Sequence, residues 1–158
     1  CIIALAVTFL GTSVVLVAQP SMLPTYAPGD RLFVDKLLFH LTGVHRGDIL
    51  IVHWPDAWDL WQVKRIVGMP GEQVQLLEGS ALIDGKPLEE TYLAPGTATE
   101  PMNSDNWQLG PQEYFVMGDN RESRGDSRAY GPISAAGIIG RVSGRYATGS
   151  AQKNNTTP

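Results

Sequence analysis

Ser21 has an unusual setting for a loop serine. It lies in "QPSMLPT", between Pro20 and Met22, where a strongly apolar stretch ends. A loop serine commonly satisfies a nearby backbone N–H in a turn or a helix cap. To act as a nucleophile it needs a neighbouring base that takes its proton and a donor that stabilises the developing oxyanion. These partners have to come from elsewhere in the chain.

Lys64 is the candidate base. It lies within "WQVKRIVGMPG", flanked by Val63, Ile66 and Val67 in a segment with the pattern of a strand. Burial among such neighbours disfavours the ammonium form and lowers the pKa of a lysine from about 10.4, and a neutral amine can accept a proton. The alternative is that the strand carries this amine out to solvent, as lysines commonly do.

A third cluster of polar residues is "MGDNRESRGDSRAYGPI", residues 117–133. Its acidic and basic side chains balance, and it stands between the apolar runs "EYFVM" and "IIGRV". Ion pairs and hydroxyls at such a position can support a site from behind. A plain surface turn would have the same composition.

The elements that must position these residues are mainly β. Short apolar runs separated by Gly, Pro and Asp predict many short strands, namely "RLFV", "DILIVHW", "WQVKRIVG", "QVQLLEG", "ALIDG", "EYFVMG" and "IIGRVSGRY". The Asp84-Gly85 pair predicts a tight hairpin turn, and residues 35–43 have the spacing of a short helix. The Pro- and Gly-rich residues 94–112 predict a long surface excursion.

The first 18 residues, "CIIALAVTFLGTSVVLVA", carry no charge and are just long enough to cross a bilayer as a helix. A cleaved signal peptide or a buried core helix would also be apolar. The chain starts at Cys1 without a basic region, and "LVAQP" fits a signal cleavage site poorly, which favours a retained anchor whose beginning is missing.

Composition excludes several classes of function. With 16 acidic against 12 basic residues, the net charge is −4 and no basic stripe indicates a nucleic-acid surface. Cys1 is the single cysteine, so the rest of the chain has no disulfide and no cysteine-based zinc site. His40, His45 and His53 do not have a recognised ligand spacing. We therefore expect no nucleic-acid partner, no metal and no cofactor.

With these clusters in hand, the sequence resembles the type I signal peptidases, membrane-anchored serine–lysine proteases that remove signal peptides from exported proteins. "PSMLPT" resembles the nucleophile box, "RGDILIVHWP" the strand that follows it, "QVKRIVGMPGEQV" the lysine box and "GDNRESRGDSRAYGP" the C-terminal box. The resemblance covers about residues 15–145. It implies a signal-peptidase-like antiparallel β-sheet catalytic domain preceded by an N-terminal transmembrane helix.

The resulting division of the chain has three parts. Residues 1–18 are expected to be the transmembrane anchor, and residues 19–146 the β-rich catalytic domain, with a variable excursion at about 75–112. Residues 147–158 are expected to be a disordered tail.

The resemblance also implies roles for individual residues. Ser21 is implied as the nucleophile and as an oxyanion donor through its backbone N–H, and Lys64, 43 positions later, as the general base. Where the family usually has Ser or Thr as a second oxyanion donor, this chain has Gln19, whose amide either takes that role or simply marks the membrane boundary. Where the family has a serine that helps orient the lysine, this chain has Arg124, and Ser123 lies one residue early.

The other matching residues of the C-terminal box are expected to support the site. Asp126 and Arg128 are implied as a structural ion pair beneath it. The matching positions are Gly118, Asp119, Asn120, Arg121, Asp126, Ser127 and Arg128.

The implied substrates are precursors that carry a signal peptide, bound extended against a strand edge, with small residues at the first and third positions before the cut. The implied location is the cell membrane, as a single-pass protein in contact with the lipid bilayer, with the catalytic domain on the extracytoplasmic side. The sequence does not give the oligomeric state, and we expect a monomer. The tryptophans of "HWPDAWDLW", residues 53–61, either dip into the membrane interface or pack in the core.

Two other interpretations stay open. A LexA-like self-cleaving protein shares a Ser–Lys dyad, but it should carry a DNA-binding region and an internal cleavage site, and neither is visible in the sequence. A catalytically inactive, membrane-anchored β domain that binds extended peptides would have the same overall pattern.

Overall fold

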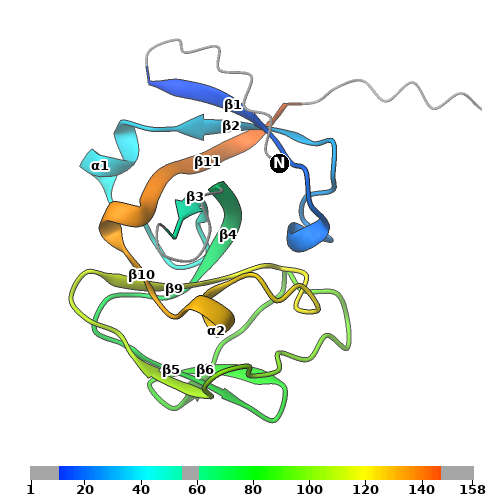
Figure 1. The fold of residues 1–158 in the computed structure, drawn as a ribbon, viewed down its shortest axis with the longest axis vertical. Helices are drawn as coiled ribbons and strands as arrows, with labels where there is room; N and C mark the ends of the chain where they lie inside the picture. The colour runs from blue at the N-terminus through cyan, green and yellow to red at the C-terminus, as the bar shows by residue number, and fades with distance from the viewer. Residues whose placement is uncertain (1–10, 55–60, 147–158) are drawn as a thin grey trace, which may run out of the picture.

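The computed structural model describes residues 11–54 and 61–146, which form two antiparallel sheets (Figure 1). The strands of the larger sheet are β1 (Thr12–Leu16), β2 (Arg31–Asp35), β3 (Ile49–His53), β4 (Trp61–Gly68), β9 (Glu113–Met117), β10 (Ile133–Ser134) and β11 (Ile138–Tyr146). The strands of the smaller sheet are β5 (Gln73–Leu77), β6 (Ser80–Ile83), β7 (Lys86–Pro87) and β8 (Asn106–Gln108). The prediction of a mainly β, antiparallel fold is therefore confirmed.

The strand order is β1-β2-β11-β3-β4-β9-β10 in the larger sheet and β7-β6-β5-β8 in the smaller one. The helical elements described are short: α1 (Leu38–Thr42), α2 (Ser127–Tyr130), and the 3₁₀ turns η1 (Pro20–Met22) and η2 (Ala135–Gly137). No helix in the described ranges is long and apolar enough to cross a membrane.

The core lies on both faces of the larger sheet. Along β3, Ile49 and Ile51 pack into one apolar cluster, whereas Leu50 and Val52 pack into another. Successive side chains of a strand point to opposite faces, so a strand covered on both sides is a continuous apolar run such as "ILIV". A third cluster, which includes Phe115 of β9, joins the larger sheet to β5 and β6.

Two local predictions are confirmed. Asp84 and Gly85 have φ values of 50° and 74°, and they form the turn between β6 and β7. This left-handed conformation is the one that an Asp-Gly pair tolerates. The helix expected within residues 35–43 is α1.

The excursion differs from its prediction in one respect. Residues 106–108 form β8, which pairs with β5. Trp107 lies opposite Val74 in this pairing, and its ring centroid is 4.6 Å from that of Phe115. Burial of the tryptophan against the core therefore draws part of the polar segment into the smaller sheet.

The predicted helix over residues 1–18 is wrong for the part that the structure describes. Thr12–Leu16 form β1, which pairs with β2. Its residues alternate between buried and partly buried, and Val15, which is 2% exposed, packs in the core. Two-residue periodicity and β-branched side chains fit a strand better than a helix. Residues 1–10 and the predicted tail, 147–158, lie outside the described ranges.

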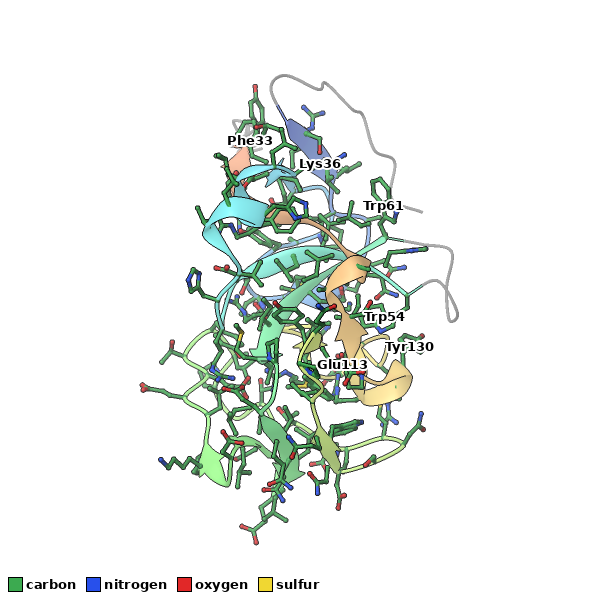
Figure 2. All side chains as sticks on the ribbon, turned by 90° about the vertical axis from the view of Figure 1, so that its left-hand side faces the viewer. Phe33, Lys36, Trp54, Trp61, Glu113 and Tyr130 are labelled. Atoms are coloured by element: carbon green, nitrogen blue, oxygen red, sulfur yellow. The ribbon has the colours of Figure 1, made fainter. Side chains whose placement is uncertain are left out.

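The tryptophans of residues 53–61 do not act as one group. Trp54 is buried and lies beside Tyr130 (Figure 2). The centroids of the two rings are 5.7 Å apart. Trp61 is 37% exposed. Core packing thus holds for Trp54, while Trp61 stays available to an interface. Trp58 lies outside the described residues.

Candidate active site

Ser21 lies in η1, a single turn that follows β1. Pro20 occupies the first position of this turn, and its carbonyl accepts a hydrogen bond of 3.2 Å from the N–H of Leu23. Met22 is fully buried in a core cluster and anchors the turn. Ser21 itself is 6% exposed, so the turn holds it in a largely desolvated position.

Lys64 lies on β4, opposite Leu50 of β3, and is 1% exposed. It does not reach solvent, which answers the question that the sequence left open. The pKa of its amine is lowered from 10.5 to about 8, mainly by burial. The charge of Arg128 lowers this pKa further, whereas the charges of Asp126 and Asp119 oppose the shift. A lysine with such a pKa is partly neutral near neutral pH, as a general base must be.

The three segments singled out in the sequence meet in the structure. The turn η1 lies against β4, and the loop after β9 lies on η1. The N–H of Asn120 donates to the Ser21 carbonyl at 3.1 Å, and its side-chain amide donates to the Pro20 carbonyl at 3.2 Å. A Cβ atom at Gly118 would lie 2.4 Å from the Ser21 carbonyl oxygen, so only glycine allows this approach.

Asp119 connects the serine segment to the lysine strand. The Arg65 guanidinium donates to both of its carboxylate oxygens, at 2.8 Å and 2.6 Å, and the Thr25 hydroxyl donates to one of them. Burial by itself lowers the pKa of Arg65, but the hydrogen bond and the charge of Asp119 outweigh it and raise that pKa. Because Arg65 follows Lys64 in β4, this buried contact fixes the strand beside the candidate base.

Asp126 and Arg128 form the buried ion pair that the resemblance implies, with Nη2 and Oδ2 2.8 Å apart. Asp126 also accepts hydrogen bonds from the N–H groups of Gly118, at 3.2 Å, and Arg128, at 3.1 Å, the latter capping α2. The Ser127 hydroxyl accepts from the N–H of Val116 at 3.0 Å. These contacts hold the loop against β9.

Arg121 fastens the excursion to the same loop. It forms an ion pair with Glu90, donates to the Thr99 hydroxyl, and donates to the Gly118 carbonyl at 3.1 Å. Tyr92 donates to Glu90. Burial raises the pKa of Tyr92, so the phenol keeps its proton.

Sequence reasoning missed five residues of this network: Thr25, Arg65, Glu90, Tyr92 and Thr99. Thr25 and Arg65 stand inside the quoted boxes and could have been found there. Glu90, Tyr92 and Thr99 have no local signal, because the arginines that they contact, Arg121 and Arg65, are far along the chain.

The residues that depart from the family pattern lie at the margin of the site. Gln19 is exposed, and its backbone is extended, with φ −123° and ψ 153°, as expected before a proline. Ser123 is partly buried, and its carbonyl accepts a hydrogen bond of 2.6 Å from Arg128. Arg124 is exposed. Catalytic roles for Gln19 and Ser123 stay predictions.

Within residues 11–54 and 61–146, no group of three or more His, Cys, Asp or Glu side chains could hold a metal ion. The groups that the site offers are a hydroxyl, a buried amine and backbone N–H donors. This combination is suited to acyl transfer.

The comparisons with known proteins agree with this class of chemistry. The family model described as "Signal peptidase, peptidase S26" matches residues 1–147. The chain belongs to this family of peptidases. Family membership confirms the resemblance seen in the sequence.

Relatives and solved structures agree. The chain is 35% identical to the signal peptidase I of Leptolyngbya laminosa, over 82% of this chain and 66% of that protein. It is 34% identical to a probable signal peptidase I of Synechocystis sp., over 92% of this chain and 76% of that protein. A crystal structure of a signal peptidase I from Enterococcus faecalis aligns with a TM-score of 0.52 and 28% identity, over 62% of this chain and 95% of that chain.

Proposed function

We propose that this chain is a serine endopeptidase of the signal peptidase I type, which removes signal peptides from exported precursor proteins. The observation that carries the proposal is the family match over residues 1–147. A signal-bearing precursor is the substrate that the names of the relatives indicate. This match favours signal peptide cleavage over the LexA-like alternative.

The mechanism is acyl transfer by a Ser–Lys dyad. Neutral Lys64 takes the proton of the Ser21 hydroxyl, and the Ser21 oxygen attacks the scissile carbonyl. The backbone N–H of Ser21 stabilises the oxyanion, with the Gln19 side chain as second donor. Lys64 then gives the proton to the leaving amine, and water, activated by the same lysine, hydrolyses the acyl-enzyme. The low exposure of both residues and the lowered pKa of Lys64 support these roles.

The supporting residues hold this geometry rather than react. Asn120 and Gly118 support the Ser21 turn, Asp119 joins it to β4, and the Asp126–Arg128 pair fixes the loop beneath Lys64. The full supporting set is Gly118, Asp119, Asn120, Arg121, Ser123, Asp126, Ser127 and Arg128. The precursor lies extended along the edge of β1 that no strand of residues 11–54 and 61–146 pairs with, at one end of the larger sheet.

The catalytic domain works at the membrane surface, on the extracytoplasmic side, as a single-pass monomer. Residues 1–10 carry no charge and join the fold at Gly11, whose carbonyl accepts a hydrogen bond of 2.9 Å from the Lys36 N–H. Beside this junction, Leu37, Leu38 and Leu41 are 59%, 61% and 85% exposed. Exposed leucines next to an apolar leader are suited to contact with lipid.

Lys36 precedes these leucines in the chain, and its amine lies near Trp61. The Lys36 amine lies 5.6 Å from the centre of the Trp61 ring, and Figure 2 shows the two side chains on neighbouring parts of the fold. Tryptophan and lysine are the residues that favour the boundary between lipid and water. Their position supports a membrane contact on this side of the domain.

The deciding experiment is cleavage of a signal-bearing precursor by the detergent-solubilised protein, compared with Ser21→Ala and Lys64→Ala. We expect cleavage by the wild type and none by either variant, because nucleophile and base act as one unit. Thermal unfolding checks that both variants fold. Near-wild-type turnover in either variant would refute the dyad, while precursor binding without cleavage by the wild type would indicate the inactive peptide-binding domain.

A further inference from the structure

Glu90 and Tyr92 lie together in a turn of the excursion. The N–H of Leu93 donates to the Glu90 carbonyl at 3.1 Å, which closes the turn, and the Tyr92 hydroxyl donates to the Glu90 carboxylate. The Glu90 side chain is 8% exposed, and Tyr92 is partly buried. Each side chain therefore fixes the orientation of the other.

The Tyr92 ring covers Arg65, the residue that follows Lys64 in β4. The central carbon of the guanidinium lies 3.9 Å from the centre of the ring. A guanidinium that stacks on an aromatic face gains electrostatic attraction and packing area, and it gains more where water is excluded. The Arg65 side chain is only 11% exposed, so the ring shields one face of its guanidinium from solvent.

Glu90 anchors the tyrosine to the loop after β9. Its carboxylate pairs with Arg121, whose Nη1 donates to it at 3.0 Å. Arg121 in turn donates to the Gly118 carbonyl at 3.1 Å and to the Thr99 hydroxyl. The turn that carries Tyr92 is thus fixed to the loop that also holds Asp119, the partner of Arg65.

The charge of Asp119 connects Arg65 to the candidate base. Burial and the charge of Arg128 lower the pKa of Lys64, whereas the charges of Asp126 and Asp119 raise it. Arg65 donates to both carboxylate oxygens of Asp119 and so compensates its charge. Without the ring, Arg65 would be wetter and less fixed, and Asp119 would be less compensated. Both changes favour the ammonium form of Lys64.

We propose that Tyr92, anchored by Glu90, is a positioning residue for the reaction, and that it acts on Lys64 through Arg65. The role in the reaction rests on the proposed function. Tyr92 lies outside the four sequence boxes that carry the family resemblance. The excursion thereby helps to prepare the base, in addition to packing against the larger sheet.

The test compares substitutions of Tyr92 with a matched control. Tyr92→Leu removes the ring, and Tyr92→Met, which fills the space with a flexible side chain, replaces it if the leucine variant does not fold. Tyr92→Phe keeps the ring over Arg65. The control is Trp107→Leu, because this partly buried aromatic residue of the same excursion packs on Phe115 and not on an arginine.

The first readout is the pKa of Lys64, followed by a carbon NMR titration of the lysine side chains. The signal of Lys64 is identified by its loss in Lys64→Met. We expect a pKa near 8 in the wild type, in Tyr92→Phe and in Trp107→Leu. In Tyr92→Leu we expect a value about one unit higher, because the ammonium form is less disfavoured.

The second readout is the pH profile of kcat/KM on a signal-sequence peptide. A rise of about one unit lowers the neutral fraction of Lys64 at pH 7 about tenfold, and kcat/KM of Tyr92→Leu should fall by the same factor. This loss should largely disappear near pH 10, where the lysine is mostly neutral in both proteins. A packing defect alone would lower kcat/KM at every pH.

Three results would overturn this role of Tyr92. They are an unchanged pKa of Lys64 in the variants without the ring, an equal shift in Trp107→Leu, and a shift in Tyr92→Phe as large as in Tyr92→Leu. Failure of the wild type to cleave the peptide would instead overturn the proposed function. The NMR titration needs no cleavage, so it decides separately whether Tyr92 is coupled to Lys64.

Discussion

The protonation of Lys64 gives the sharpest prediction. Its pKa is lowered from 10.5 to about 8, chiefly by burial. At pH 7 about one tenth of such a lysine is neutral, whereas the unshifted amine would be neutral in only about one molecule in 3,000. Burial in β4 thus increases the reactive form of the base by roughly 300-fold. We expect kcat/KM to rise about tenfold per pH unit below pH ~8 and to level off above it.

Stability offers a second measure of the same shift. Between about pH 8 and pH 10.5 the unfolded chain holds a proton on Lys64 that the folded chain has lost, so stability rises with pH across this window. A shift of 2.5 units corresponds to about 3 kcal/mol, as an upper bound. The variant Lys64→Met keeps the volume and removes the charge. Its stability advantage over the wild type should therefore be largest below pH 8 and should shrink as the pH rises to 10.5.

The assays are a pH profile of kcat/KM on a signal-sequence peptide and denaturant unfolding of the two proteins at several pH values. Lys64→Met also serves as the inactive baseline for the kinetic profile. A kinetic pKa near 10, a rate that is flat across neutrality, or a stability difference that does not change with pH would each refute the reasoning from burial.

Two further predictions concern the margin of the site and the membrane. Gln19→Ala should lower kcat about 10²- to 10³-fold if its amide is the second oxyanion donor, and Gln19→Ser should recover much of this loss. Turnover of the alanine variant within about threefold of wild type, at equal thermal stability, would exclude that role. The double variant Leu38→Glu and Leu41→Glu should bind liposomes more weakly than wild type, because both side chains are exposed beside the apolar leader. The control is Glu78→Gln, in the turn between β5 and β6. Equal liposome binding by all three proteins would count against a lipid contact at α1.

The sequence predicts the central strands because their pattern has few alternatives. β3 and β4 are apolar runs bounded by turn residues, but the same pattern left open whether the Lys64 amine is buried or reaches solvent. The strand β1 was not predictable in this way. Its residues are uncharged, and they continue an uncharged leader that also fits a membrane helix. The pairing of Val14 with Phe33 is a tertiary contact, which local pattern does not reveal.

The contacts made by the excursion were also beyond the sequence. Glu90 stands in a polar stretch with no motif, and it reaches Arg121 only because the chain folds back over the loop after β9. A buried ion pair between distant residues leaves no trace in periodicity or composition. The matched boxes contain Ser21 and Lys64, but the cleft lined by Leu23, Pro24 and residues 94–98 and 119–122 depends on this long-range pairing.

Arg124 departs from the family pattern, and this bears on how Lys64 is made able to act as a base. An exposed arginine stands where the resemblance places a serine that helps orient the lysine, so the buried surroundings of Lys64 have to prepare it without that hydroxyl. Its largest cause is burial, which any well-packed strand can supply, whereas Asp126 opposes the shift by favouring the ammonium form. Arg128 holds Asp126 in a buried ion pair and itself lowers the pKa of Lys64. Asp126 can therefore cap α2 and hold the loop, while Arg128 partly cancels the increase that Asp126 causes in the pKa of Lys64.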